Sequence, residues 1–82
     1  MNKQYVLWNL SEARREITRM LREIESDPEY DFGRYVVDMA HLYHHINTAW
    51  NARDASDEAA RLCSEADFER WRQFPSSEEI VL

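Results

Sequence analysis

Two stretches decide the fold of this chain: residues 6–24, VLWNLSEARREITRMLREI, and residues 32–50, FGRYVVDMAHLYHHINTAW. In both of them apolar residues recur at alternating spacings of four and three. This spacing is typical of an α-helix that packs one side against a similar helix. The first apolar row is Val6, Leu10, Ala13, Ile17, Met20 and Ile24, and the second is Phe32, Val36, Met39, Tyr43, Ile46 and Trp50. The pattern predicts a helical hairpin in which the two rows meet.

The helix boundaries follow from the residues between the rows. The first stretch has no Gly or Pro in its interior and is rich in good helix formers, so we expect a helix over about residues 3–26. A second helix is expected over about residues 28–53, with Asp27 as its N-cap and Pro28 in its first turn. A start at Asp31 is the alternative. Because the connection is only a few residues long, the two helices should be antiparallel neighbours.

The C-terminal third predicts one or two short helices. Ser56 is a candidate N-cap for a helix over about residues 57–63. Ser64 opens an approximate capping box before a helix over about residues 65–74, which a proline ends. Residues 76–82 are expected to form a flexible tail.

The size and composition of the chain suggest self-association. Its 82 residues predict one all-α domain, over residues 1–75, that buries roughly 60% of the surface of the unfolded chain. Yet 44% of the residues are hydrophobic. Beside its main row, the second helix carries a flank formed by Tyr35, Leu42 and Ala49 that one partner helix cannot cover. We therefore expect two hairpins to form a four-helix-bundle-like homodimer, with this flank in the contact.

The cysteine count and the absence of long apolar segments indicate the compartment. Cys63 is the only cysteine, so no intrachain disulfide can form and a reducing environment is expected. No segment approaches the roughly 20 apolar residues of a membrane span, and the N-terminus does not have the pattern of a secretory signal. These observations predict a cytoplasmic protein without a membrane partner.

The charge of the chain argues against nucleic acid as a partner. The net charge is −6, and residues 54–82 carry three basic and eight acidic groups. Phosphate binding depends on basic charge, so an acidic chain is a poor candidate for it. The acidic third is better suited to a basic partner.

A polar face of the second helix could hold a metal. His41 and His45 are four residues apart, and Asp38 lies three residues before His41, so the three side chains share one side of the helix. One carboxylate and two imidazoles are suitable ligands for zinc or another transition metal. This side lies nearly opposite the predicted apolar row and is expected to face solvent. A polar outer face without metal is the alternative, as is a subunit contact that loosens when the histidines become charged.

The outer side of the first helix is a candidate partner surface. Trp8, Arg15, Arg19 and Arg22 project in roughly one direction, and Trp with Arg is the composition of binding hot spots. With Tyr35 and Leu42 of the dimer flank, they form the predicted set of partner-binding residues. In the alternative, the arginines pair with neighbouring glutamates and Trp8 lies under the C-terminal segment.

No motif in the chain predicts catalysis. Cys63 could act as a nucleophile with a histidine as its base, but nothing in the local sequence, such as an adjacent glycine turn, supports this role. Gly33 is the single glycine, so no glycine-rich phosphate loop can be built. The sequence therefore predicts a small non-enzymatic interaction module, an adaptor or a regulatory subunit. The alternative is a helical bundle that binds a metal through Asp38, His41 and His45.

Overall fold

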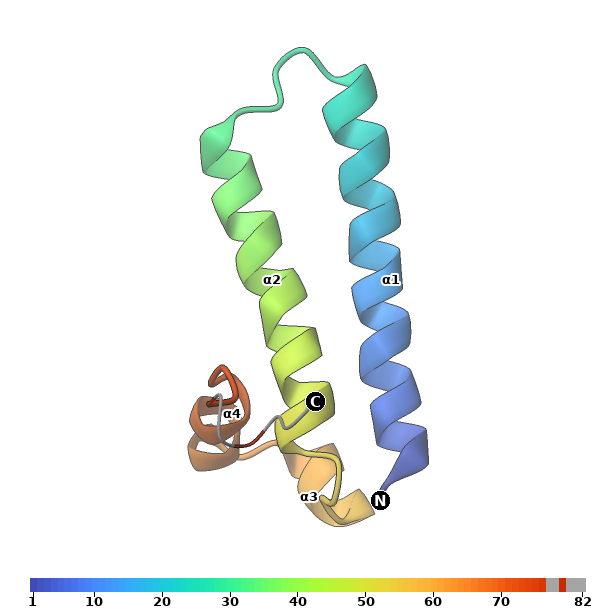
Figure 1. The fold of residues 1–82 in the computed structure, drawn as a ribbon, viewed down its shortest axis with the longest axis vertical. Helices are drawn as coiled ribbons and strands as arrows, with labels where there is room; N and C mark the ends of the chain where they lie inside the picture. Colours follow the sequence, from blue (N-terminus) through green and yellow to red (C-terminus); the bar gives the residue numbers. More distant parts are fainter. Residues whose placement is uncertain (77–78, 80–82) are drawn as a thin grey trace.

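The chain is described by a computed structural model, which places residues 1–76 and residue 79. These residues form four helices and no strand: α1 (Lys3–Ser26), α2 (Phe32–Asn51), α3 (Asp57–Leu62) and α4 (Glu65–Trp71). Figure 1 shows α1 and α2 side by side as a long hairpin, with α3 and α4 at its open end. The predicted all-α hairpin with short C-terminal helices is confirmed. Most of the tail predicted at residues 76–82 lies outside the described residues.

The sequence prediction is correct for α1 and wrong by four residues for the start of α2. Asn2 caps α1 by accepting a hydrogen bond from the backbone N–H of Tyr5 at 3.1 Å. α2 begins after Asp31, whose Oδ1 accepts from the backbone N–H of Arg34 at 3.0 Å. Asp27 does not cap α2, because its Oδ1 instead accepts from the N–H of Glu29 within the turn. The alternative start at Asp31 is therefore the correct one.

The two short helices begin at the serines that the sequence indicates, but they end earlier than predicted, α3 at Leu62 rather than at residue 63 and α4 at Trp71 rather than at residue 74. Ser56 accepts from the N–H of Ala59, and Ser64 accepts from the N–H of Asp67. α4 packs on the side of α2 that faces away from α1 (Figure 1). Trp71 anchors α4 with 3% of its surface exposed. Side-chain amides of α2 fix the end of α4, as Asn47 donates to the carbonyl of Arg72 and Asn51 to that of Trp71.

The contact between α1 and α2 differs from the predicted one by a rotation of α2. Its buried apolar cluster consists of Ala13 and Met20 of α1 with Leu42 of α2, against which Met39 packs. Leu42 and Ala49 are buried, although the sequence analysis assigned them to an outer flank. Members of the predicted row lie outside instead, including Phe32, which is 78% exposed. The apolar arc of α2 is wider than one partner helix can cover, so the apolar pattern alone does not fix which part of it faces α1.

Candidate functional site

An ion-pair network joins α1 and α2 near the closed end of the hairpin. The carboxylate of Asp38, in α2, is buried and accepts hydrogen bonds from Arg19 Nη2 of α1 at 2.8 Å and from the Tyr30 hydroxyl at 2.6 Å. Arg19 also donates to Glu16 and Glu23 on its own helix. A buried carboxylate is stable only when it is paired and hydrogen-bonded. Both conditions are met here, so the rotation of α2 that brings Asp38 to Arg19 is the favoured one.

The electrostatics of this network keep Asp38 ionised. Its hydrogen bonds from Arg19 and Tyr30 lower the pKa of the carboxyl group. The same bond to Asp38 raises the pKa of Tyr30 to about 12. Arg34 extends the network across the loop, donating to Asp27 at 2.7 Å and to Glu23 at 3.1 Å. The hydrogen bond from Arg34 in turn lowers the pKa of Asp27.

A second buried polar contact lies toward the open end. Asn9 of α1 is 1% exposed, and its amide donates to the backbone carbonyl of Tyr5 at 3.1 Å. Its Oδ1 lies 3.3 Å from Nδ1 of His45 in α2, a hydrogen bond in which the imidazole is the donor. The edge of the His45 ring also packs against Trp8, with 5.9 Å between ring centroids. The sequence analysis missed Asn9, although a short polar residue inside the first apolar stretch could have indicated it.

The hairpin leaves one apolar face uncovered. We define the apolar face by six of the seven large apolar side chains that are 40–49% exposed, leaving out Tyr43, whose ring packs against Phe74. The six are Leu10, Ile17 and Ile24 of α1, and Tyr35, Val36 and Ile46 of α2. At 100° per residue, the α1 members are rotated by roughly 20–60° from Ala13, and the α2 members by roughly 20–120° in the same sense from Leu42. Because α1 and α2 are antiparallel, rotations in the same sense bring both rows to one side of the hairpin.

The surface area of the chain is large for its mass. A compact monomer of 9.9 kDa is expected to expose roughly 5,200 Å². This chain exposes 6294 Å², and its radius of gyration of 14.4 Å compares with about 12 Å for a compact domain of this length. The excess of roughly 1,100 Å² exceeds the 800 Å² or so that each partner contributes to a standard protein interface. The chain thus has enough surplus surface to form such an interface.

The structure does not gather the predicted metal ligands on an outer face. Asp38 faces α1 and is bound to Arg19 and Tyr30, and His45 is turned toward Asn9, whereas His41 is exposed. The predicted orientation of this side toward solvent is therefore wrong for Asp38. Among the described residues, no three His, Cys, Asp or Glu side chains are close enough to hold a metal ion. Zinc binding by Asp38, His41 and His45 stays a prediction.

The structure brings the three arginines of the predicted partner surface to one hollow on α1, which Trp8 does not line. Arg19 points to α2 through Asp38, and Arg15 pairs with Glu12 at 2.9 Å, while Arg22 is exposed. Trp8 is 54% exposed. Of the two flank residues that complete the predicted set, Tyr35 belongs to the apolar face and Leu42 to the buried cluster. Binding of a partner by this set stays a prediction.

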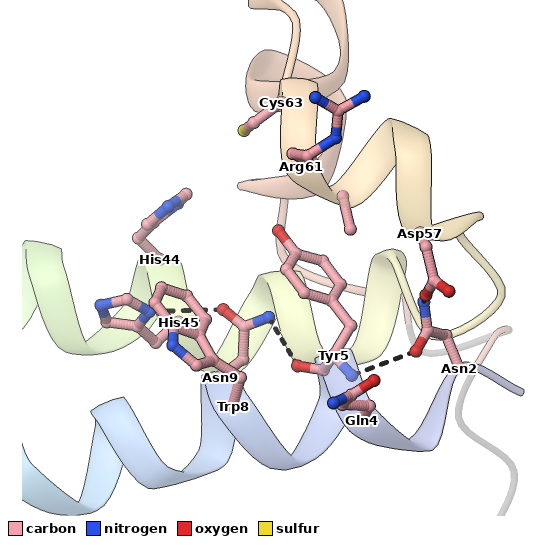
Figure 2. A pocket seen from close by; sticks show the side chains of 11 residues that line it. Asn2, Gln4, Tyr5, Trp8, Asn9, His44, His45, Asp57, Arg61 and Cys63 are labelled. Atoms are coloured by element: carbon pink, nitrogen blue, oxygen red, sulfur yellow. Dashed lines mark hydrogen bonds between the residues drawn. The ribbon is translucent and has the colours of Figure 1, made fainter.

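A cavity of about 530 Å³ lies between α3 and the open end of the hairpin (Figure 2). Tyr5 and Trp8 of α1, His44 and His45 of α2, and Cys63 after α3 contribute to its lining. Cys63 is the left-handed C-cap of α3, with a φ of 40°, and it is exposed rather than buried as a small apolar residue would be. The cavity is therefore bounded by three helices but open to solvent at its rim.

Within the part of the chain that the structure places, no helix has both the length and the apolar character needed to cross a membrane. Comparisons with protein-family models, with curated proteins and with solved structures find no match.

Proposed function

We propose that this chain is a non-enzymatic interaction module, an adaptor or regulatory subunit, that assembles as a homodimer through its apolar face. The observation that carries the proposal is the exposure of Leu10, Ile17 and Ile24 beside Tyr35, Val36 and Ile46. Contiguous apolar patches of this kind on a small protein mark interaction sites. A second copy is the occupant that we infer, because the face is a pair of antiparallel helical rows and matches itself.

The geometry of two helical rows supports a four-helix bundle. Two such faces can be stacked about a two-fold axis, so that the rows of one hairpin enter the grooves of the other. A two-fold contact uses the same patch on both copies, which requires the patch to be self-complementary. The surplus surface of roughly 1,100 Å² per chain is sufficient for a standard interface. Each copy would then bury the apolar groups that its own fold leaves exposed.

The charge distribution favours one orientation of the two copies. Residues 54–82 carry a net charge of −5, and α3 and α4 hold most of them at the open end of the hairpin. Parallel stacking would bring two acidic ends together, whereas antiparallel stacking places them at opposite ends of the dimer. We therefore propose the antiparallel arrangement. Both acidic ends stay accessible in it and suit a basic partner.

Two neighbouring valines provide a matched test. Val36 belongs to the apolar face and is 48% exposed, whereas Val37 is 55% exposed and lies about 100° away around the helix. We expect Val36→Glu to shift sedimentation toward the single-chain species, because each interface would bury two unpaired carboxylates. Val37→Glu adds the same charge and should leave the mass unchanged. Equal masses for both variants and the unmodified chain would contradict the proposed surface.

A further inference from the structure

The cavity at the open end has the dimensions of a small-molecule site. α3 lies across the ends of α1 and α2 and leaves about 530 Å³ between them (Figure 2). Ligand pockets commonly measure about 300–1,000 Å³ and combine an apolar lining with a few polar groups. The N-terminus ties α3 in place, because Asn2 donates to the carbonyl of Ala55 at 2.9 Å and to Asp57 at 3.1 Å. This space is therefore held open by hydrogen bonds rather than filled by side chains.

Two aromatic rings form one wall of the cavity. The rings of Tyr5 and Trp8 are nearly parallel, with 6° between their planes and 6.3 Å between their centroids. Both project from α1 into the space below α3 in Figure 2. Trp71 packs edge-on against Tyr5, and His45 packs edge-on against Trp8, so both rings are held in orientation. Parallel aromatic faces of this kind favour stacking of a flat molecule.

A polar atom without a partner lies at the edge of this wall. Nδ1 of His44 is buried and has no hydrogen-bond partner among the described residues. Its ring packs against Phe68, at 4.8 Å between centroids, and against His45 at 5.4 Å. Burial lowers the pKa of His44, so its imidazole is neutral at pH 7 and offers one donor and one acceptor. His44 therefore adds a neutral ring to the lining, while its Nδ1 lies beneath the surface of the cavity.

The charges at the rim do not favour an ionic ligand. Asp57 and Arg61 are the two residues of opposite charge that line the cavity, and they lie at the side of α3. We propose that the cavity binds a neutral, planar aromatic molecule of about bicyclic size, which packs against the aromatic wall formed by Tyr5 and Trp8. This site adds ligand binding to the proposed interaction module and does not depend on the dimer.

A titration with benzimidazole tests the proposal, because this molecule is flat, bicyclic and neutral at pH 7.5. Binding is followed by NMR through the indole N–H signal of Trp8, with the full chain. We expect saturable shifts of this signal and weaker binding of the carboxylate and aminomethyl derivatives. Absence of saturable shifts, or equal binding of the charged derivatives, would overturn the proposal.

Three variants locate the binding. Trp8→Ala removes the indole reporter, so binding to this variant is followed through the proton signals of benzimidazole itself. It should be weaker by about tenfold, the scale of one lost stacking contact. Leu7→Ala, at an exposed neighbour outside the cavity lining, should leave the affinity unchanged. Ala60→Trp fills the cavity from α3 and should abolish binding while the helical content is retained. Unchanged affinity in Ala60→Trp would place the molecule elsewhere and overturn the assignment, as would equal losses in the Trp8 and Leu7 variants.

Discussion

The contact between α1 and α2 and the apolar face beside it differ in the kind of side chain that they bury or leave exposed. Between α1 and α2, Asp38 and Asn9 are 8% and 1% exposed, and each is hydrogen-bonded to a partner on the other helix. On the adjoining apolar face, Ile17 and Ile46 are both 42% exposed. The chain thus buries polar groups internally while it leaves large aliphatic side chains outside.

A single copy of the chain can supply hydrogen-bond partners for these buried polar groups, but it leaves large apolar side chains exposed to water. A buried polar group needs a specific partner, and Arg19, Tyr30 and His45 supply these partners within the chain. Apolar groups need only removal from water, which any matching surface can provide. The polar contact therefore sets the rotation of α2, while the apolar face stays exposed in the single chain, where we propose that a second copy covers it.

Two alanine variants compare the two sides directly. Leu42→Ala removes a side chain from the buried cluster and should lower the free energy of unfolding by about 3 kcal/mol. Ile17→Ala should cost about 2 kcal/mol per chain, because the proposed dimer would bury this side chain. Chemical denaturation at one fixed protein concentration measures both losses. A loss below about 0.5 kcal/mol for Ile17→Ala is the value for an exposed residue and would contradict the dimer.

Asp38→Ala breaks the polar contact. The variant leaves Arg19 and Tyr30 without their shared acceptor, and we expect a loss of about 2 kcal/mol in the free energy of unfolding. Denaturant titration measures this loss. Asp38→Asn is the control that keeps the shape of the side chain and removes its charge, so it should cost less than Asp38→Ala. An alanine variant as stable as the unmodified chain would show that the network is not needed to set the rotation of α2.

Asn9→Ala breaks the second polar contact and tests a smaller effect. It removes the acceptor of His45 and a bond to the carbonyl of Tyr5, so we expect a loss of about 1 kcal/mol. Thermal unfolding followed by circular dichroism measures the change. Ser11→Ala, on the same helix, is the control, because no hydrogen bond of its hydroxyl joins it to α2 among the described residues. Equal melting temperatures for the two variants would contradict a role for Asn9.

The pH dependence of stability should reveal the half-buried imidazole of His44 on α2. Burial, together with His45, Arg72 and His41, lowers the pKa of His44 in the folded chain. As the pH falls below about 6.5, the unfolded chain takes up this proton before the folded chain does. Stability is therefore retained above about pH 6.5 and decreases below it. His44→Gln should flatten the decrease between about pH 7.5 and 5.5 in denaturation experiments, and equal slopes would contradict the assignment.

The smallest effect is expected on the outer side of α1. Arg15 forms an exposed pair with Glu12 at 2.9 Å, and such pairs contribute little because water and salt screen them. Arg15→Ala should change the free energy of unfolding by less than about 0.5 kcal/mol. Denaturation at low and high salt checks this value. A loss as large as that of Asp38→Ala would show that the outer pair is not screened as proposed.

Local sequence signals predicted the elements well. The run without Gly or Pro gave the bounds of α1, and the serine caps located α3 and α4. These features depend on residues within a few positions of one another. The sequence left two candidate N-caps for α2, Asp27 and Asp31. Asp27 accepts a hydrogen bond from the N–H of Glu29 within the turn, and Asp31 caps the helix.

The rotation of α2 could not be predicted from the apolar pattern. The pattern ranks faces by hydrophobicity and therefore placed Phe32 and Tyr43 against α1. The structure places Leu42 there, because Asp38 reaches Arg19 across a separation of 19 residues in sequence. Pairings over such distances leave no periodic signal. The direction in which the predicted metal ligands point, and the cavity wall at Tyr5 and Trp8, both depend on how α1 and α2 are rotated about their axes. The apolar pattern does not specify this rotation.

The mass of the unmodified chain in solution tests the central claim most directly. Sedimentation equilibrium over a wide concentration range should give twice the chain mass of 9.9 kDa, with dissociation only on dilution. This result would mean that the apolar face is covered by a second copy. A single-chain mass at every concentration would contradict the account, because the face would then remain in water.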